Sequence, residues 1–165
     1  MPVEIERKFL LANDDWRARV VRSEDMQQGY LAGPPATRCS VRVRLAGERA
    51  WLNIKSPGGI VRDEYEYPLP LADARRMLVT LVGNVVAKRR HQVEVDGQRF
   101  EIDEFGGANA GLVVAEIELA SEDAPFPRPA WLGREVSALP RYYNVQLALR
   151  PFGEWSADER NATDA

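Results

Sequence analysis

The sequence predicts an α+β protein in which about eight strands form a closed antiparallel β-barrel, with helices packed on the outside. Segments in which polar and apolar residues alternate recur along the chain, and short turn-like connections join most of them. Few segments have the spacing of an amphipathic helix. Several strands also repeat like charges on one face, which favours a closed sheet over an open one.

The first strand is predicted at residues 3–10, where charged and apolar side chains alternate. Asn13, Asp14 and Asp15 follow and predict the start of a short helix over residues 16–22. The second strand is predicted at residues 27–31, before a Gly-Pro-Pro turn.

Residues 39–45 and 50–55 are predicted to form a hairpin around the turn Ala46-Gly47-Glu48. A Ser-Pro-Gly-Gly turn then leads to a strand at residues 61–69. After Pro70, apolar residues at helical spacing predict a helix over residues 71–82.

Two further strands, at residues 85–95 and 99–105, flank Asp96-Gly97, a dipeptide typical of two-residue hairpin turns. Another strand is predicted at residues 112–119 and helical segments within 131–149. The polar residues 157–165 are expected to be poorly ordered. The domain is predicted to span residues 1–153, followed by a polar C-terminal tail at 154–165.

The composition is that of a globular protein, with 45% hydrophobic and 28% charged residues among 165. The formal net charge of −3 gives no sign of a surface for nucleic acid or an anionic membrane. No apolar run approaches the roughly 18–20 residues of a membrane-spanning helix. Cys39 is the only cysteine, so an internal disulfide is excluded and a cytoplasmic location is expected. A homodimer is compatible with these features.

Charged residues share one face of several predicted strands, opposite an apolar face. In the first strand, Glu4, Glu6 and Lys8 lie opposite Val3 and Ile5. The cations on such faces are Lys8, Arg42, Arg44, Lys55, Lys88 and Arg90. The carboxylates are Glu4, Glu6, Glu64, Glu66, Glu101, Asp103, Glu116 and Glu118.

Each charged face, taken alone, is most simply the solvated side of an antiparallel sheet. The repetition argues for something else, because like charges two residues apart on a strand repel each other. A closed barrel with a charged, wet interior is the alternative. Its arginines and lysines suit the oxygens of a polyphosphate, and its carboxylate pairs suit Mg²⁺ or Mn²⁺. A guest and its metal would complete the charge balance.

The same segments resemble the CYTH domains of the triphosphate tunnel metalloenzyme superfamily. The N-terminal Glu-x-Glu-x-Lys resembles the family signature, and the later segments resemble its strand motifs in the family's order. These are Gln28-Gly29-Tyr30-Leu31, Val41-Arg42-Val43-Arg44, Ile54-Lys55-Ser56, Glu64-Tyr65-Glu66, Lys88-Arg89-Arg90 and Ala115-Glu116-Ile117-Glu118. Residues 131–136 and Tyr143-Asn144 resemble its C-terminal region, so the resemblance covers roughly residues 2–152.

This resemblance implies metal-dependent hydrolysis of a small triphosphate, most simply inorganic tripolyphosphate, inside an eight-stranded tunnel. It implies that Lys8, Arg42, Arg44, Lys55, Lys88 and Arg90 hold phosphate oxygens. It also implies that Glu4, Glu6, Glu116 and Glu118 hold one or two Mg²⁺ or Mn²⁺ ions, with Asp103 as a further ligand. Glu64, Glu66 and Glu101 are interpreted as partners of neighbouring arginines.

A pair formed by Lys88 and Tyr30 is a candidate to activate or orient the attacking water. Neighbouring cations should depress the pKa of Lys88, and Tyr30 shares a strand face with Gln28. His91 falls on the opposite face and is expected to be structural, whereas Trp51 shares the parity of Lys55 and is expected at one mouth of the tunnel.

Other activities remain open at this point. A class IV adenylate cyclase and a thiamine triphosphatase would use the same tunnel, although the His-Phe motif typical of such cyclases is absent from the sequence. A non-catalytic polyphosphate-binding module would need the cations but not the Glu-x-Glu pairs.

Overall fold

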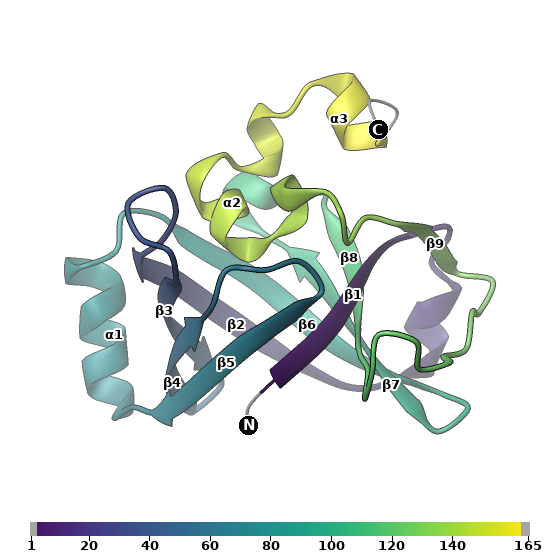
Figure 1. Ribbon diagram of the computed structural model, residues 1–165, viewed down its shortest axis with the longest axis horizontal. Coiled ribbons are helices and arrows are strands. Elements are labelled where there is room, and N and C mark those ends of the chain that lie inside the picture. Colours follow the sequence, from purple (N-terminus) through teal and green to yellow (C-terminus); the bar gives the residue numbers. More distant parts are fainter. Residues whose placement is uncertain (1–2, 163–165) are drawn as a thin grey trace.

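The computed structural model describes residues 3–162 and contains a closed antiparallel β-barrel (Figure 1). Eight strands form the wall in the neighbour order β5-β4-β3-β2-β6-β7-β8-β1, and β1 also pairs with β5. They are β1 (Val3–Leu11), β2 (Val20–Ala32), β3 (Ser40–Ala46), β4 (Arg49–Lys55), β5 (Val61–Pro68), β6 (Val85–Val95), β7 (Gln98–Phe105) and β8 (Val113–Glu118). The predicted fold class is therefore confirmed.

The barrel closes along β1, which has a different partner on each side. Its first residues pair with β5, from Val3 opposite Asp63 to Ile5 opposite Val61. Its other edge pairs with β8, with Glu6 opposite Glu118 and Lys8 opposite Glu116. Along β1, only the first residues pair with β5. The last residues of β1 pair with the short strand β9 (Leu132–Glu135), which covers an edge that would otherwise be free.

Two tight turns form where the sequence predicts them. Asp96 and Gly97 join β6 to β7 with φ values of 49° and 77°, as a type I′ hairpin turn requires. Gly47, between β3 and β4, has a φ of 56°. These turns set the register in which charged side chains of neighbouring strands face the same side.

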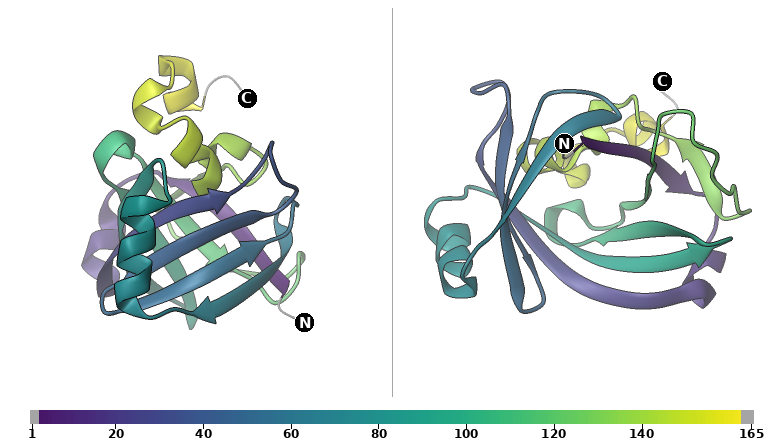
Figure 2. Two further views of the ribbon diagram at one scale, coloured as in Figure 1. Left: turned by 90° about the vertical axis from the view of Figure 1, so that its left-hand side faces the viewer. Right: turned by 60° about the horizontal axis from the view of Figure 1, so that its bottom comes forward.

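The apolar core lies on the outside of the barrel wall. Helix α1 (Leu71–Thr80) packs Ala74 and Leu78 against Val43 and Ala50, and so covers β3 and β4 (Figure 2). A second cluster joins α2 (Asn144–Leu149) to β6 and β8 through Leu147, Tyr142 and Trp155. The third lies over β1, β7 and β8 and contains Phe9, Trp16, Phe100, Ile117 and Trp131. Because burial of apolar side chains takes place outside, the inner face is free to be polar.

The helix predicted at residues 16–22 is wrong in type and extent. A 3-10 turn, η1 (Asp15–Arg19), is followed directly by β2, which begins at Val20 rather than at residue 27. The cause is the long partner strand: β6 pairs with β2 from Val20 to Gly29. Tertiary pairing thus decides the conformation of a segment whose local signals favour a helix.

The C-terminal region differs from its predicted helices. It contains β9, the 3-10 turns η3 (Pro140–Tyr142) and η4 (Phe152–Glu154), and the short helix α2, while η2 (Gly107–Asn109) lies earlier, before β8. Part of the tail that was expected to be poorly ordered forms α3 (Ala157–Asn161). Ser156 and Glu159 form a capping box at its start, a Ser-x-x-Glu signature that is visible in the sequence. The last residues of that tail, 163–165, lie outside the described residues.

Within residues 3–162, no helix is long and apolar enough to cross a membrane.

Candidate active site

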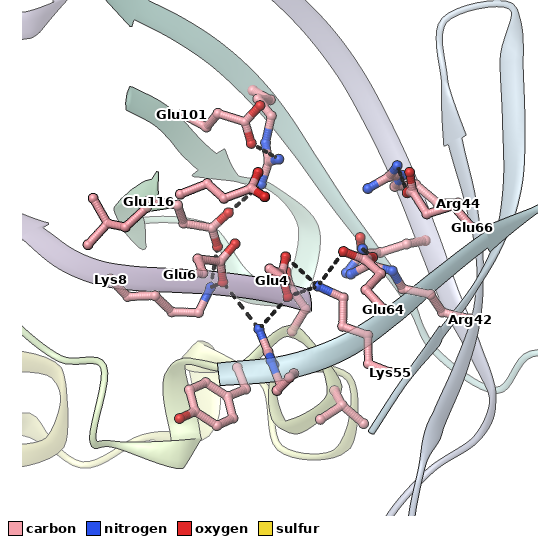
Figure 3. A pocket seen from close by; sticks show the side chains of 18 of the residues that line it. Glu4, Glu6, Lys8, Arg42, Arg44, Lys55, Glu64, Glu66, Glu101 and Glu116 are labelled. Carbon is pink, nitrogen blue, oxygen red and sulfur yellow. Dashed lines mark hydrogen bonds and ion pairs between the residues drawn. The ribbon is translucent and has the colours of Figure 1, made fainter. Parts of the chain in front are cut away.

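The barrel encloses a cavity of about 640 Å³, here called the tunnel cavity, and all eight wall strands contribute side chains to it. It contains the predicted substrate-binding cations and the two Glu-x-Glu pairs of β1 and β8 (Figure 3). The charged faces therefore face inward, and the solvated-sheet interpretation is wrong. The lining residues are Glu4, Glu6, Lys8, Met26, Gln28, Tyr30, Ser40, Arg42, Arg44, Lys55, Arg62, Glu64, Glu66, Lys88, Arg90, Gln98, Arg99, Glu101, Glu116, Glu118, Leu119, Ala120, Ala124, Pro125, Tyr143, Asn144 and Val145.

Lys8 lies between two carboxylates on the inner face of β1 and β8. Its Nζ is 2.6 Å from Glu6 Oε1 and also donates to Glu116 Oε1. Burial alone would lower the pKa of Lys8, but the charges of Glu116 and Glu6 outweigh it and raise the pKa above its usual value. The raised pKa favours the charged form of Lys8, which suits it to binding an anion rather than to accepting a proton.

Asp103 lies behind the cavity lining and holds two cations. Its Oδ2 accepts from Lys88 Nζ at 2.5 Å and from Arg90 Nη2 at 2.7 Å, and its Oδ1 accepts from Arg90 Nε at 2.7 Å. Arg90 also donates to Glu116 Oε2 at 2.6 Å and to Glu101. Asp103 does not line the tunnel cavity, although the family resemblance implies that it is a further metal ligand.

Lys88 has a pKa that is lowered to about 8. Burial is the largest cause and the charge of Arg90 adds to it, while Asp103 opposes the change. The sequence predicts this direction from neighbouring cations, and the structure gives burial as the stronger cause. A fraction of Lys88 is therefore neutral near physiological pH.

Arg62 is a site residue that the sequence argument missed. It lies on β5 and donates from Nη2 to Glu4 Oε2 at 3.1 Å and to Glu6 Oε1 at 3.4 Å. Lys55 contacts the same Glu4 carboxylate, with both oxygens 2.8 Å from its Nζ. Strand parity could have found Arg62, because residues 62, 64 and 66 share one face of β5.

Glu118 is the carboxylate with the least compensation. Within residues 3–162 its side chain has no hydrogen bond or ion pair, and its backbone lies opposite Glu6 in the β1–β8 ladder. Burial raises its pKa, and the charges of Glu4 and Glu6 raise it further. The carboxylates of Glu6 and Glu118 therefore lie on neighbouring strands, and no cation forms an ion pair with Glu118 among the described residues.

The carboxylates of β1 and β8 fit a divalent ion by their chemistry. They are hard oxygen donors, and a metal would balance the charge that accumulates around Glu118. Among the described residues, no group of three or more such donors already has a metal-binding arrangement. The reason is visible in the contacts, since Glu4, Glu6 and Glu116 are paired with Lys55, Arg62 and Lys8.

Tyr30 and Lys88 both line the tunnel cavity but have different hydrogen-bond partners among the described residues. Gln28 Nε2 lies 3.5 Å from the Tyr30 hydroxyl. Burial raises the pKa of Tyr30, and the charge of Arg42 acts in the opposite direction. Lys88 instead contacts Asp103 and, at 3.4 Å, Asn144 Oδ1.

His91 lies on the outer side of the wall, as expected for a structural histidine. Its Nδ1 is 2.8 Å from Ser23 Oγ, its Nε2 is 3.2 Å from Glu104 Oε2, and its ring packs against Trp16. It is not among the residues of the tunnel cavity.

Residues 2–147 match the CYTH domain family. An inorganic triphosphatase of Acetivibrio thermocellus is 40% identical over 154 residues, which cover 92% of this chain and 97% of that protein. An inorganic triphosphatase of Nitrosomonas europaea is 38% identical over 150 residues, or 88% and 97% of the two chains.

A crystal structure of an inorganic triphosphatase superposes on this structure with a TM-score of 0.66 and 35% sequence identity. The superposition covers 88% of this chain and 94% of the other chain. Both the sequence and the barrel therefore agree on the same family. The chain belongs to the CYTH domain family.

Proposed function

We propose that this protein is a divalent-metal-dependent triphosphatase that hydrolyses a small triphosphate, with inorganic tripolyphosphate as the preferred substrate. Water attacks a terminal phosphorus, the bond to the bridging oxygen breaks, and pyrophosphate, phosphate and a proton result. The observation that carries the proposal is the cavity inside the closed barrel, lined by paired cations and carboxylates. The relatives that are named inorganic triphosphatases, at 40% and 38% identity, support the choice of substrate.

The cations of the tunnel are proposed to bind the phosphate oxygens. These are Lys8, Arg42, Arg44, Lys55, Lys88 and Arg90, and we add Arg62. Most of them already pair with a carboxylate on an adjacent or nearby wall strand, so the network is close to neutral. A bound triphosphate would take over these cations and free the carboxylates.

Glu4, Glu6, Glu116 and Glu118 are the proposed holders of one or two Mg²⁺ or Mn²⁺ ions. Their carboxylates are the ligands that these hard ions prefer. When bound, such an ion supplies charge neutralisation on the phosphates and a lower pKa for a coordinated water. We propose a different role for Asp103, because Lys88 and Arg90 already occupy both of its oxygens. Asp103 then acts as a positioning residue.

Lys88 is the proposed acceptor of the proton from the attacking water. Its pKa of about 8 leaves part of the population neutral, whereas Lys8, with its raised pKa, cannot take this role. Tyr30 is proposed to orient the water or the phosphate from the same cavity. Positioning and charge stabilisation supply the larger part of the rate in phosphoryl transfer.

We also propose that residues 1–153 form the catalytic domain. A cytoplasmic location is proposed because the single cysteine, Cys39, leaves no internal disulfide to require an oxidising compartment.

The test is phosphate release from tripolyphosphate, ATP and thiamine triphosphate, each with and without Mg²⁺ or Mn²⁺. The proposal expects metal-dependent release that is fastest from tripolyphosphate. Cyclic AMP formed from ATP without free phosphate would identify a cyclase. Binding of tripolyphosphate without release from any substrate would identify a binding module, and either result overturns the proposal.

A further inference from the structure

A second cavity of about 190 Å³ adjoins the tunnel cavity near the β3–β4 turn and is here called the vestibule. It shares Met26, Arg44, Arg90 and Glu101 with the tunnel cavity. Its other lining residues are Arg22, Glu24, Ala46, Arg49, Trp51 and Gln92. Trp51 lines the vestibule and not the tunnel cavity, and Arg22 and Arg49 of the same lining are exposed to solvent.

The vestibule has an excess of positive charge in a protein whose net charge is −3. Four arginines and two glutamates line it. Arg44 and Arg90 also pair with carboxylates outside this lining. The excess positive charge therefore lies at Arg22 and Arg49, which share the single carboxylate of Glu24. The tunnel cavity is more evenly balanced, because nearly every cation there faces a carboxylate. A cleft of one sign with low-dielectric walls focuses the field and attracts the opposite charge.

The exposure of the arginine side chains falls steadily from the vestibule to the tunnel. Arg22 and Arg49 are each 55% exposed, Arg44 is 17% exposed and Arg90 is 12% exposed. An anion that approaches from solvent therefore meets exposed arginines first and buried ones later.

Two contacts hold the exposed arginines at this place. Glu24 pairs with both of them, at 3.3 Å from Arg22 and at 3.1 Å from Arg49. The ring of Trp51 contacts both Arg49 and Arg44, with its centroid 5.2 Å and 5.1 Å from the two guanidinium carbons. Trp51 thus makes cation–π contacts with both Arg49, at the surface, and Arg44, which lines the tunnel.

We propose that the vestibule is an anion-docking site at which the polyanionic substrate binds first and from which it passes to the tunnel. Arg22 and Arg49 attract the phosphate chain, and Arg44 and Arg90 receive it. Glu24 competes with the anion for the two exposed arginines and so limits how tightly the chain is retained there. This inference rests on the proposed function, since it concerns the route of a triphosphate to that tunnel.

The test compares an R22Q/R49Q variant with the wild type, using inorganic tripolyphosphate and Mg²⁺ over a range of ionic strengths. We expect kcat/KM to fall by about 3- to 10-fold at low salt, with the loss in KM rather than in kcat, and the difference to shrink as salt screens the charges. An R75Q/R76Q variant is the matched control, because it removes the same charge from the exposed face of α1.

An E24Q variant tests the same idea without loss of an arginine and is expected to raise kcat/KM at low salt. If kcat/KM of R22Q/R49Q depends on salt in the same way as kcat/KM of the wild type and of R75Q/R76Q, the inference is overturned. A parallel loss of kcat would also overturn it, because these arginines would then contact the reacting phosphates. A wild type without triphosphatase activity would instead overturn the proposed function, so the two failures are distinguishable.

Discussion

Lys88 Nζ lies 2.5 Å from Asp103 Oδ2, and both side chains are hidden from solvent, with exposures of 2% and 0%. Lys88 lines the tunnel cavity, whereas Asp103 lies behind the lining and contacts Lys88 from there. This arrangement gives Asp103 control over the position and the pKa of the proposed proton acceptor.

Replacing Asp103 with asparagine should lower kcat by about 10- to 100-fold, because a poorly placed reacting group loses rate steeply. The Mg²⁺ concentration for half-maximal activity should stay near that of the wild type. The carboxylate of Asp103 normally opposes the fall in the pKa of Lys88, so the pH profile should also move to lower pH. A large rise in the Mg²⁺ requirement of D103N would restore the metal-ligand assignment.

The activity should rise with pH up to about 8, where Lys88 loses its proton, and level off above it. The sign follows from the role, since only the neutral amine accepts a proton and it predominates above its pKa. The measurement is kcat for tripolyphosphate between pH 6 and pH 10 at saturating metal. K88R keeps its positive charge throughout and should lack this limb, and a limb that persists in K88R would assign it to another group.

Replacing Glu118 with glutamine or alanine should abolish activity at ordinary metal concentrations and leave folding stability nearly unchanged. Its pKa is raised in the folded protein, so the ionised form is disfavoured there and its removal costs little. The measurements are activity against Mg²⁺ concentration and the midpoint of thermal unfolding. Wild-type activity in E118A would remove Glu118 from the metal site.

Replacing Arg62 with glutamine should lower kcat/KM for tripolyphosphate by about 10- to 100-fold, the range of a lost charge-assisted hydrogen bond. The exposed Arg38, on the loop before β3, offers a control in R38Q that also removes one positive charge. Equal kcat/KM in the two variants would show that Arg62 serves only to neutralise Glu4 and Glu6.

Replacing Gly29 with alanine should destabilise the protein by about 1–3 kcal/mol through overpacking. A Cβ at this position would lie 2.2 Å from Cγ1 of Val82, a residue of the segment that follows α1. Gly59 is the matched control, because a Cβ there meets nothing within 4 Å. Chemical denaturation of both variants measures the difference, and an unchanged free energy of unfolding in G29A would show that Val82 moves aside.

The sequence predicts the strands and the inner faces well because strand parity is a local property. Alternation alone places Glu4, Glu6 and Lys8 on one face. The β1–β8 register then sets Glu6 opposite Glu118 and Lys8 opposite Glu116. The early start of β2 could not be predicted, since it depends on the length of β6. The contacts of Asp103 with Lys88 and Arg90 could not be predicted either, because the burial of a side chain in the barrel wall depends on how several strands pack together. Arg62 was within reach but was missed beside the two glutamates of its strand.

The outward position of the apolar clusters has a consequence for how such a protein can change over generations. Alternate residues of each strand have separate duties, as Val43 packs under α1 while its neighbours Arg42 and Arg44 face the tunnel. Mutations at outward-facing positions therefore affect mainly the stability of the fold, whereas mutations at inward-facing positions affect mainly which anion is bound. A barrel of this kind can acquire a new preferred anion while its hydrophobic scaffold is inherited unaltered.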